Sequence, residues 1–243
     1  MKIVAIIQAR MGSTRLPGKV LMDLEGATVL ARVLARAKRA VTINEVVVAT
    51  TDLPADDVII GECKRLAATV FRGDENDVLD RYYRAAQFSK ADVVVRITAD
   101  CPLLDPEITD RTVSEFLDQR PDYASNVLIR TYPRGLDTEV FTITALERAW
   151  REGSERYQRA HVTPYIYQNP EQFRVLAVKG EQDYSGFRWT LDTPQDLEFL
   201  RAVYARFPGR DDFGWLEVRA LLEREPHLLE LNRDVAQKAL HEG

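Results

Sequence analysis

Short apolar runs alternate with stretches of helical periodicity through the first hundred residues. Four of the runs have the length and the β-branched content of buried strands, and they cover residues 3–7, 45–51, 68–71 and 92–98. Apolar residues recur at helical spacing between them, in residues 28–40, 55–67 and 77–88. This β-α-β-α order predicts an α/β fold with a parallel sheet and right-handed crossovers.

The pattern is less regular after Asp105. It predicts further strands at residues 123–128, 138–143, 174–179 and 187–191. It predicts further helices at residues 145–152, 156–168, 194–205 and 213–224. Pro164 would kink the second of these helices, and Pro194 stands at the favoured first-turn position of the third. Residues 225–243 have no pattern that assigns them to an element.

The loop after the first strand combines glycines, hydroxyls and cations. Its sequence, residues 7–21, is I-Q-A-R-M-G-S-T-R-L-P-G-K-V-L. Ligands of open α/β sheets bind outside the carboxyl ends of the strands, where this loop is expected. Several cations and close backbone approach suit a polyphosphate. The loop matches neither the Walker A motif nor the dinucleotide-binding fingerprint.

Two aspartates follow later segments of the predicted sheet. Asp100 comes directly after the fourth strand, and Asp192 lies in W-T-L-D-T-P-Q-D-L. Taken singly, each could be a local cap, and Asp192 precedes a good helix start. Opposite a phosphate-binding loop, two carboxylates could instead hold Mg²⁺ against phosphate oxygens. Without metal such a pair would repel, which predicts that Asp192→Asn leaves the metal-free protein as stable as the wild type or more so.

Composition narrows the classes of partner. The formal net charge of the 243 residues is −5, which argues against a broad nucleic-acid-binding surface. The only cysteines, Cys63 and Cys101, form neither zinc-ligand spacing nor a disulfide framework, as expected in a reducing cytoplasm. No apolar stretch predicts a signal peptide or a membrane span. We therefore expect a cytoplasmic protein without nucleic-acid or membrane partners.

Several motifs together resemble one family. The loop pattern A-R-x-x-S-x-R-L-P-x-K-x-L is followed by F-R-G-D-E-N-D-V-L-D-R-Y-Y, A-D-C-P-L-L-D, Y-P-R-G-L-D-T-E-V-F, H-V-T-P-Y-I and W-T-L-D-T-P-Q-D-L. This series resembles the spore-coat polysaccharide biosynthesis branch of the cytidylyltransferase family, relatives of the CMP-sialic acid and CMP-Kdo synthetases. The resemblance covers roughly residues 1–205.

The resemblance implies a fold and a reaction. The fold is a Rossmann-like three-layer α/β/α nucleotidyltransferase sandwich with a mostly parallel sheet and a small β-containing arm. It forms one domain over residues 1–243, with an insertion around residues 125–185 for dimerisation or acceptor binding. The reaction transfers CMP from CTP to a sugar acid or related sugar, with Mg²⁺ and with release of pyrophosphate, for surface polysaccharide biosynthesis. The implied assembly is a homodimer.

The resemblance also implies roles for individual residues. The nucleotide-binding candidates are Gln8, Ala9, Arg10, Gly12, Ser13, Arg15, Lys19, Arg72, Asp74, Asp77 and Asp80, of which the last four would read the base. Asp100 and Asp192 would bind the metal and, with Arg10 and Lys19, form the catalytic set. The sugar-binding candidates are Arg134, Asp137, Glu139, His161 and Arg188. Relatives often carry Glu directly before the histidine, where this chain has Ala160, which weakens an acid–base role for such a pair.

Two other functions match part of the pattern. A glycosyltransferase that uses a finished nucleotide-sugar commonly has a D-x-D motif at a strand end, whereas this chain has Ala99-Asp100-Cys101 there. A non-catalytic nucleotide-sugar-binding protein would need neither isolated carboxylate and would release no pyrophosphate.

Overall fold

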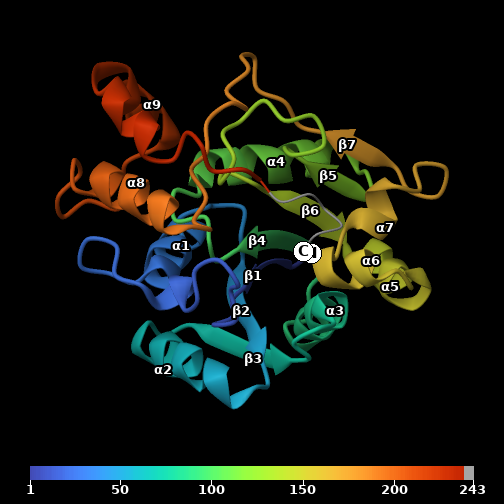
Figure 1. Cartoon of the computed structure of the whole chain (residues 1–243). Coiled ribbons are helices and arrows are strands. Elements are labelled where there is room, and N and C mark those ends of the chain that lie inside the picture. The colour runs from blue at the N-terminus through green and yellow to red at the C-terminus, as the bar shows by residue number, and fades with distance from the viewer. Residues whose placement is uncertain (238–243) are drawn as a thin grey trace.

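A seven-stranded sheet forms the middle layer of the computed structural model, which describes residues 1–237 (Figure 1). Its strands are β1 (Ile3–Gln8), β2 (Glu45–Thr51), β3 (Thr69–Gly73), β4 (Val93–Thr98), β5 (Tyr123–Ser125), β6 (Glu139–Thr142) and β7 (Val175–Ala177). They lie in the order β3-β2-β1-β4-β6-β5-β7, and only β6 runs antiparallel to its neighbours. The predicted mostly parallel sheet is therefore confirmed.

Helices cover both faces of the sheet because alternate strand residues point to opposite sides. Ile3, Ala5 and Ile7 pack beneath α1 (Val29–Ala37), α2 (Asp57–Arg65) and α4 (Pro106–Gln119). Val4 and Ile6 pack on the other side, in a cluster with residues of α3 (Val78–Phe88), α5 (Ile143–Glu152) and the short helix α7 (Pro164–Tyr167). The short helix α6 (Arg156–His161) lies against α3. The three-layer α/β/α sandwich is thus confirmed. No helix in the described part of the chain has the length and apolar character needed to cross a membrane.

A third apolar cluster packs the C-terminal helices against the extended segment that precedes them. It contains α8 (Pro194–Tyr204), α9 (Trp215–Arg224) and the 3-10 helix η3 (Pro226–Leu231), and these pack on the buried residues Trp189 and Leu191. Figure 1 shows α8 and α9 on the side of the central strands away from α5 and α6. Because Trp189 and Leu191 are buried in this cluster, the next residue, Asp192, is fixed at the rim of the sheet.

Three element predictions differ from the structure. No helix is predicted at α4, although Asp105 caps it and Pro106 occupies its first turn, which is a standard start signal. The predicted strand at 187–191 is an extended segment with only an isolated bridge between Arg188 and Arg134. The predicted helix at 156–168 is divided into α6 and α7, because Val162 adopts a positive φ of 74° before Pro164 begins the second helix.

The segment around residues 125–185 extends the main sheet. It contributes β6 and β7, which join the sheet through β4 and β5. Its helices α5 to α7 belong to the same layer as α3. A role of this segment in dimerisation stays a prediction.

Candidate active site

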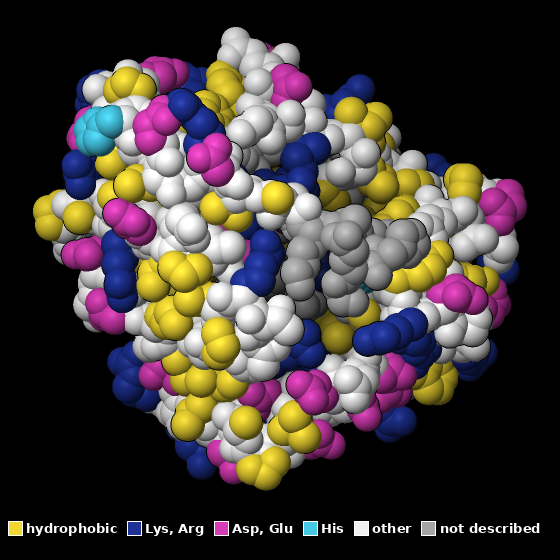
Figure 2. Space-filling view, in the orientation of Figure 1, with side chains coloured by type: hydrophobic (Ala, Val, Ile, Leu, Met, Phe, Trp, Pro, Cys, Tyr) yellow, Lys and Arg dark blue, Asp and Glu magenta, His cyan; other side chains and the backbone are white. Residues whose placement is uncertain are grey.

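A cavity of about 760 Å³ opens at the carboxyl ends of β1 and β4. Its lining residues come from six separate parts of the chain, as expected at the carboxyl edge of a doubly wound sheet. They are Gln8, Arg15, Arg96, Thr98, Asp100, Cys101, Val127, Leu128, Arg134, Asp137, Glu139, His161, Thr163, Tyr167, Thr190, Asp192 and Gln237. Figure 2 shows Lys and Arg side chains around the centre of the face seen in Figure 1. The fold therefore brings residues predicted to bind phosphate, metal and sugar together around one cavity.

Lys19 joins the two predicted metal carboxylates. Its Nζ lies 2.7 Å from Asp100 Oδ2, 2.8 Å from Asp192 Oδ1 and 2.7 Å from the carbonyl oxygen of Leu191. Gly18, in the left-handed region at φ 73°, allows the chain to turn into the short helix η1 (Lys19–Leu21) that carries this lysine. The side chain of Lys19 is only 12% exposed, so the contacts are largely shielded from water.

The charges of this cluster stabilise one another. Burial by itself would lower the pKa of Lys19, but Asp100 and Asp192 raise it above its ordinary value. Burial would raise the pKa of Asp100, yet Lys19 lowers it below its ordinary value. The expectation of an uncompensated repulsion between the two carboxylates is therefore wrong, because an ammonium lies between them.

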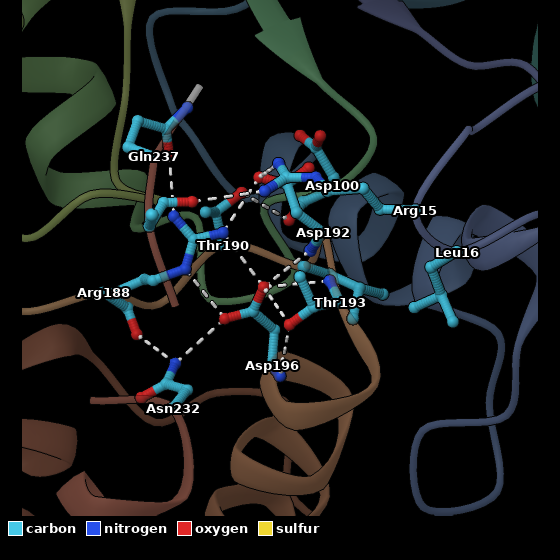
Figure 3. Close-up of polar contacts among 12 residues, drawn as sticks. Arg15, Leu16, Asp100, Arg188, Thr190, Asp192, Thr193, Asp196, Asn232 and Gln237 are labelled. Atoms are coloured by element: carbon cyan, nitrogen blue, oxygen red, sulfur yellow. Dashed lines mark hydrogen bonds and ion pairs between the residues drawn. The ribbon is translucent and has the colours of Figure 1, made fainter. Parts of the chain in front are cut away.

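Asp192 is not the cap of the following helix. Thr193 is the N-cap of α8: its hydroxyl accepts a hydrogen bond from Asp196 N, and Asp196 completes a capping box. The Asp192 carboxylate instead accepts from Lys19, and its Oδ2 lies 3.0 Å from both Arg15 and Arg188 (Figure 3). The structure thus removes the capping interpretation that the sequence left open.

Asp196 holds this side of the site together. It has no exposed surface, and it accepts hydrogen bonds from Arg188 at 2.8 and 2.9 Å, from the backbone nitrogens of Asp192 and Thr193, and from Asn232 (Figure 3). Arg188 therefore connects the fully buried carboxylate of Asp196 to the partly buried one of Asp192, which lines the cavity. This predicted sugar-binding residue does not line the cavity itself but positions a residue that does.

The backbone of the rest of the predicted phosphate loop is held by buried Asp56 and by hydrogen bonds within the loop. Buried Asp56 accepts a hydrogen bond from Met11 N at 2.8 Å, and both Ser13 N and Gly18 N donate to the Met11 carbonyl at 2.9 Å. The Ser13 hydroxyl accepts from Leu16 N, so it caps the loop. Gln8 lines the cavity, Ala9 is buried, and Gly12 and Arg10 lie toward Glu75, which pairs with Arg10 at 3.8 Å.

The four predicted base-reading side chains have local partners. Arg72 pairs with Asp57 at 2.8 Å and donates to two backbone carbonyls. Asp74 and Asp77 cap the turn and the helix that follow them, and Asp77 also pairs with Arg159. Asp80 accepts from Trp150 at 2.8 Å and pairs with Arg84. None of the four lines the cavity, and their contact with a base stays a prediction.

Four of the five predicted sugar residues line the cavity. Asp137 binds Arg130 through two hydrogen bonds of 2.6 and 2.9 Å. Glu139 pairs with Arg96, and His161 faces the cavity from the end of α6. Arg134 is positioned because Gly135, at φ 108°, passes so close to Trp189 that a Cβ would lie 2.6 Å from its backbone. The motif P-R-G-L-D thus brings its arginine beside the segment of Asp192.

Sequence reasoning missed further residues of the cavity wall. Arg96 was hidden within an apolar strand, and Thr163, which donates to Glu139 at 2.6 Å, follows a helix end. Gln237 accepts from Arg188 at 2.7 Å and comes from the tail that carried no pattern (Figure 3). Cys101 also lines the wall, but burial and the neighbouring Asp100 raise the pKa of its thiol well above the ordinary value, so it does not supply a thiolate.

The cluster around Lys19 offers a divalent cation two carboxylates and one carbonyl oxygen. Residues 1–237 contain no group of three or more His, Cys, Asp or Glu that could hold a metal. Asp100, Asp192 and the Leu191 carbonyl nevertheless converge on one point, and all are hard oxygen donors. Mg²⁺ is usually bound by one or two carboxylates together with substrate phosphates, so this donor set suits it.

The chain is similar to several known proteins. The family described as Cytidylyltransferase matches residues 4–235. The spore coat polysaccharide biosynthesis protein SpsF of Bacillus subtilis is 35% identical, over 92% of this chain and 95% of its own length. A cytidylyltransferase of Leptospira borgpetersenii superposes with a TM-score of 0.91 at 35% identity, over 98% of this chain and 100% of that structure.

A more distant structure shares the fold. A CMP:2-keto-3-deoxy-manno-octonic acid synthetase, solved in complex with CTP, superposes with a TM-score of 0.66 at 21% identity, over 85% of this chain and 100% of the other. The family match spans nearly the whole described chain and includes the loop of residues 7–21, Asp100 and Asp192. The protein is therefore a member of the cytidylyltransferase family and a nucleotidyltransferase.

Proposed function

We propose that the protein transfers CMP from CTP to a hydroxyl group of an acidic sugar, with Mg²⁺, and releases pyrophosphate. Membership of the cytidylyltransferase family supports CTP as the donor. The SpsF relative supports a place in the synthesis of a surface polysaccharide. Family membership also favours nucleotidyl transfer over a glycosyltransferase or a non-catalytic binding protein.

The proposal of an acidic acceptor depends on Arg134, a cavity cation that has no ion-pair partner among the described residues. Arg15 pairs with Asp192, and Arg96 pairs with Glu139. Arg134, in contrast, forms no hydrogen bond through its guanidinium and no ion pair within the described residues. Burial and the nearby Arg130 lower its pKa, and Asp137 and Asp192 only partly offset this effect. The guanidinium therefore lacks a directly paired anion among residues 1–237. An acceptor that carries a carboxylate would supply that anion.

The phosphate loop accounts for the nucleotide side. Arg15 lines the cavity, and Lys19 contacts Asp100 and Asp192, which also line it, so both could contact a triphosphate that spans from the loop to Asp100. The acceptor hydroxyl would then form a bond to the α-phosphate as the bond to the departing pyrophosphate breaks. Because the protein provides no covalent intermediate in this scheme, it acts by positioning the two substrates and neutralising charge.

Asp100 and Asp192 would hold Mg²⁺ in this reaction. When bound, the metal would neutralise charge on the phosphates and could lower the pKa of the attacking hydroxyl. Arg188 keeps Asp192 directed into the cavity, since its guanidinium is itself fixed by the buried Asp196. The two carboxylates are thus held in fixed positions at the carboxyl edge of the sheet.

The variant Arg134→Gln tests the acidic acceptor. It should raise KM for the sugar acid about 10- to 100-fold, as expected for the loss of a charge-assisted contact, and leave KM for CTP within about twofold. Pyrophosphate release would be measured with 3-deoxy-manno-octulosonate and N-acetylneuraminate as acceptors. Arg151→Gln, on the exposed face of α5, is the matched control. An equal rise in KM for CTP would place Arg134 at the triphosphate instead, and no change in either constant would refute the proposed role.

A further inference from the structure

We propose that Lys19 occupies the divalent-cation position in the nucleotide-free protein and leaves it when nucleotide binds. Metal and nucleotide would then bind in a coupled manner, and metal alone would bind weakly. This inference rests on the metal requirement of the proposed function. It assigns Lys19 a second role beside the phosphate contact predicted from the sequence.

The contacts of Lys19 carry the inference. An ammonium group has three N–H donors, and here they meet Asp100, Asp192 and the Leu191 carbonyl at 2.7 to 2.8 Å. All three donors are therefore used inside the protein, and none remains for a phosphate oxygen. The same three oxygens are the hard donors that converge here and could ligate a metal. Lys19 and a metal ion thus compete for one set of oxygens.

The charge around this set favours exchange over joint occupancy. Asp192 already contacts Arg15 and Arg188 besides Lys19, and Asp100 contacts Lys19. A divalent ion added beside the ammonium would bring the positive charge around these two carboxylates to five, with Arg15, Arg188 and Lys19 counted. The displaced ammonium needs a new anion, and the triphosphate supplies one next to the same loop. Nucleotide binding therefore makes the metal site available.

Lys19 is able to move in this way. Its aliphatic side chain has four rotatable bonds, and its ammonium is a point charge without a fixed plane. It is carried by the short helix η1 that ends the phosphate loop. Arg188, in contrast, is held by the buried Asp196 and remains to direct Asp192 when the lysine leaves.

The first experiment measures Mn²⁺ binding to the nucleotide-free protein by electron paramagnetic resonance. Lys19→Met should bind Mn²⁺ about 10- to 100-fold more tightly than the wild type, because the competing charge-assisted contacts are gone. Lys64→Met, on the exposed surface of α2, should bind like the wild type. The double variant Lys19→Met/Asp192→Asn should lose the gain. Equal affinity of Lys19→Met and wild type would overturn the proposal.

The second experiment needs no variant at this position. Melting temperatures of the wild type would be measured with Mg²⁺ alone, with CTP alone and with both. We expect almost no shift with Mg²⁺ alone and a shift with both that exceeds the sum of the separate shifts. A full shift with Mg²⁺ alone would contradict the exchange.

These tests distinguish a folding defect of Lys19→Met, failure of the exchange and failure of the proposed function. If Lys19→Met folds only when Mn²⁺ is present, that dependence itself supports the exchange, provided that the double variant is not rescued by the metal. If the double variant is rescued equally, the proposal is wrong. If CTP shifts no melting temperature under any condition, the proposed function fails, whereas the Mn²⁺ titration of the nucleotide-free protein still decides the role of Lys19.

Discussion

Asp192→Asn is expected to lower kcat for pyrophosphate release by about 10²- to 10³-fold, the usual cost of removing one electrostatic stabiliser from an active site. The carboxylate contacts Lys19, Arg15 and Arg188, so its charge positions three cations on this side of the cavity. The fold should persist, because Thr193 and not Asp192 caps α8. Steady-state kinetics with CTP and a sugar acid would measure the loss.

The same variant also tests the charge balance of the metal-free protein. Because three cations lose a shared partner, Asp192→Asn should melt at a lower temperature than the wild type in the presence of a chelator. Asp118→Asn, at the exposed end of α4, serves as the control. Turnover close to that of the wild type would remove Asp192 from the catalytic set, and a raised melting temperature would restore the idea of two repelling carboxylates.

Asp196→Ala is expected to lower the free energy of unfolding by about 3–5 kcal/mol, because it leaves Arg188 without its buried partner. Asp196 has no exposed surface and also binds Asn232 and the start of α8. Chemical denaturation at pH 7 would measure the difference from the wild type. Asp183→Ala, in an exposed turn, should change stability little.

The effect of Asp196 should depend on pH with a definite sign. Burial would raise the pKa of this carboxyl, but hydrogen bonds from Arg188 hold it below the ordinary value of 3.8. A carboxylate with a depressed pKa contributes its full stabilisation above the unfolded pKa and loses it as pH falls through the folded pKa. The difference between wild type and Asp196→Ala should therefore shrink below about pH 4. A difference under about 1 kcal/mol at pH 7 would contradict the role of Asp196, since breaking a buried pair costs more.

The sequence predicts the sheet well because its central strands are buried on both faces. Continuous apolar runs therefore mark β1, β2 and β4, and the polar residues that follow them mark the ligand-binding edge. The helix α4 has a clear start signal in Asp105-Pro106, but its apolar residues do not form a continuous run like those of the central strands. The segment at 187–191 resembled a strand because Trp189 and Leu191 are buried, but their burial comes from α8 and α9.

The pairing of charges is the part of the site that the sequence could not predict. Lys19 and Asp192 are 173 residues apart in the sequence, yet their side chains lie 2.8 Å apart in the structure. Nothing in the sequence indicates that Asp196, four residues later, would be the buried partner of Arg188. Arg134 differs from Asp196, because the family resemblance already implied that it contacts the substrate. The structure leaves its guanidinium without a carboxylate partner among the described residues.

The central claim is tested most directly by pyrophosphate release from the wild-type protein with four nucleoside triphosphates, each combined with sugar acids and with neutral sugars. The account predicts release only when CTP, Mg²⁺ and a sugar acid are present together, with a CMP-sugar of the matching mass as the second product. Release with UTP, GTP or ATP at a rate equal to that with CTP, or with neutral sugars as readily as with acids, would contradict it.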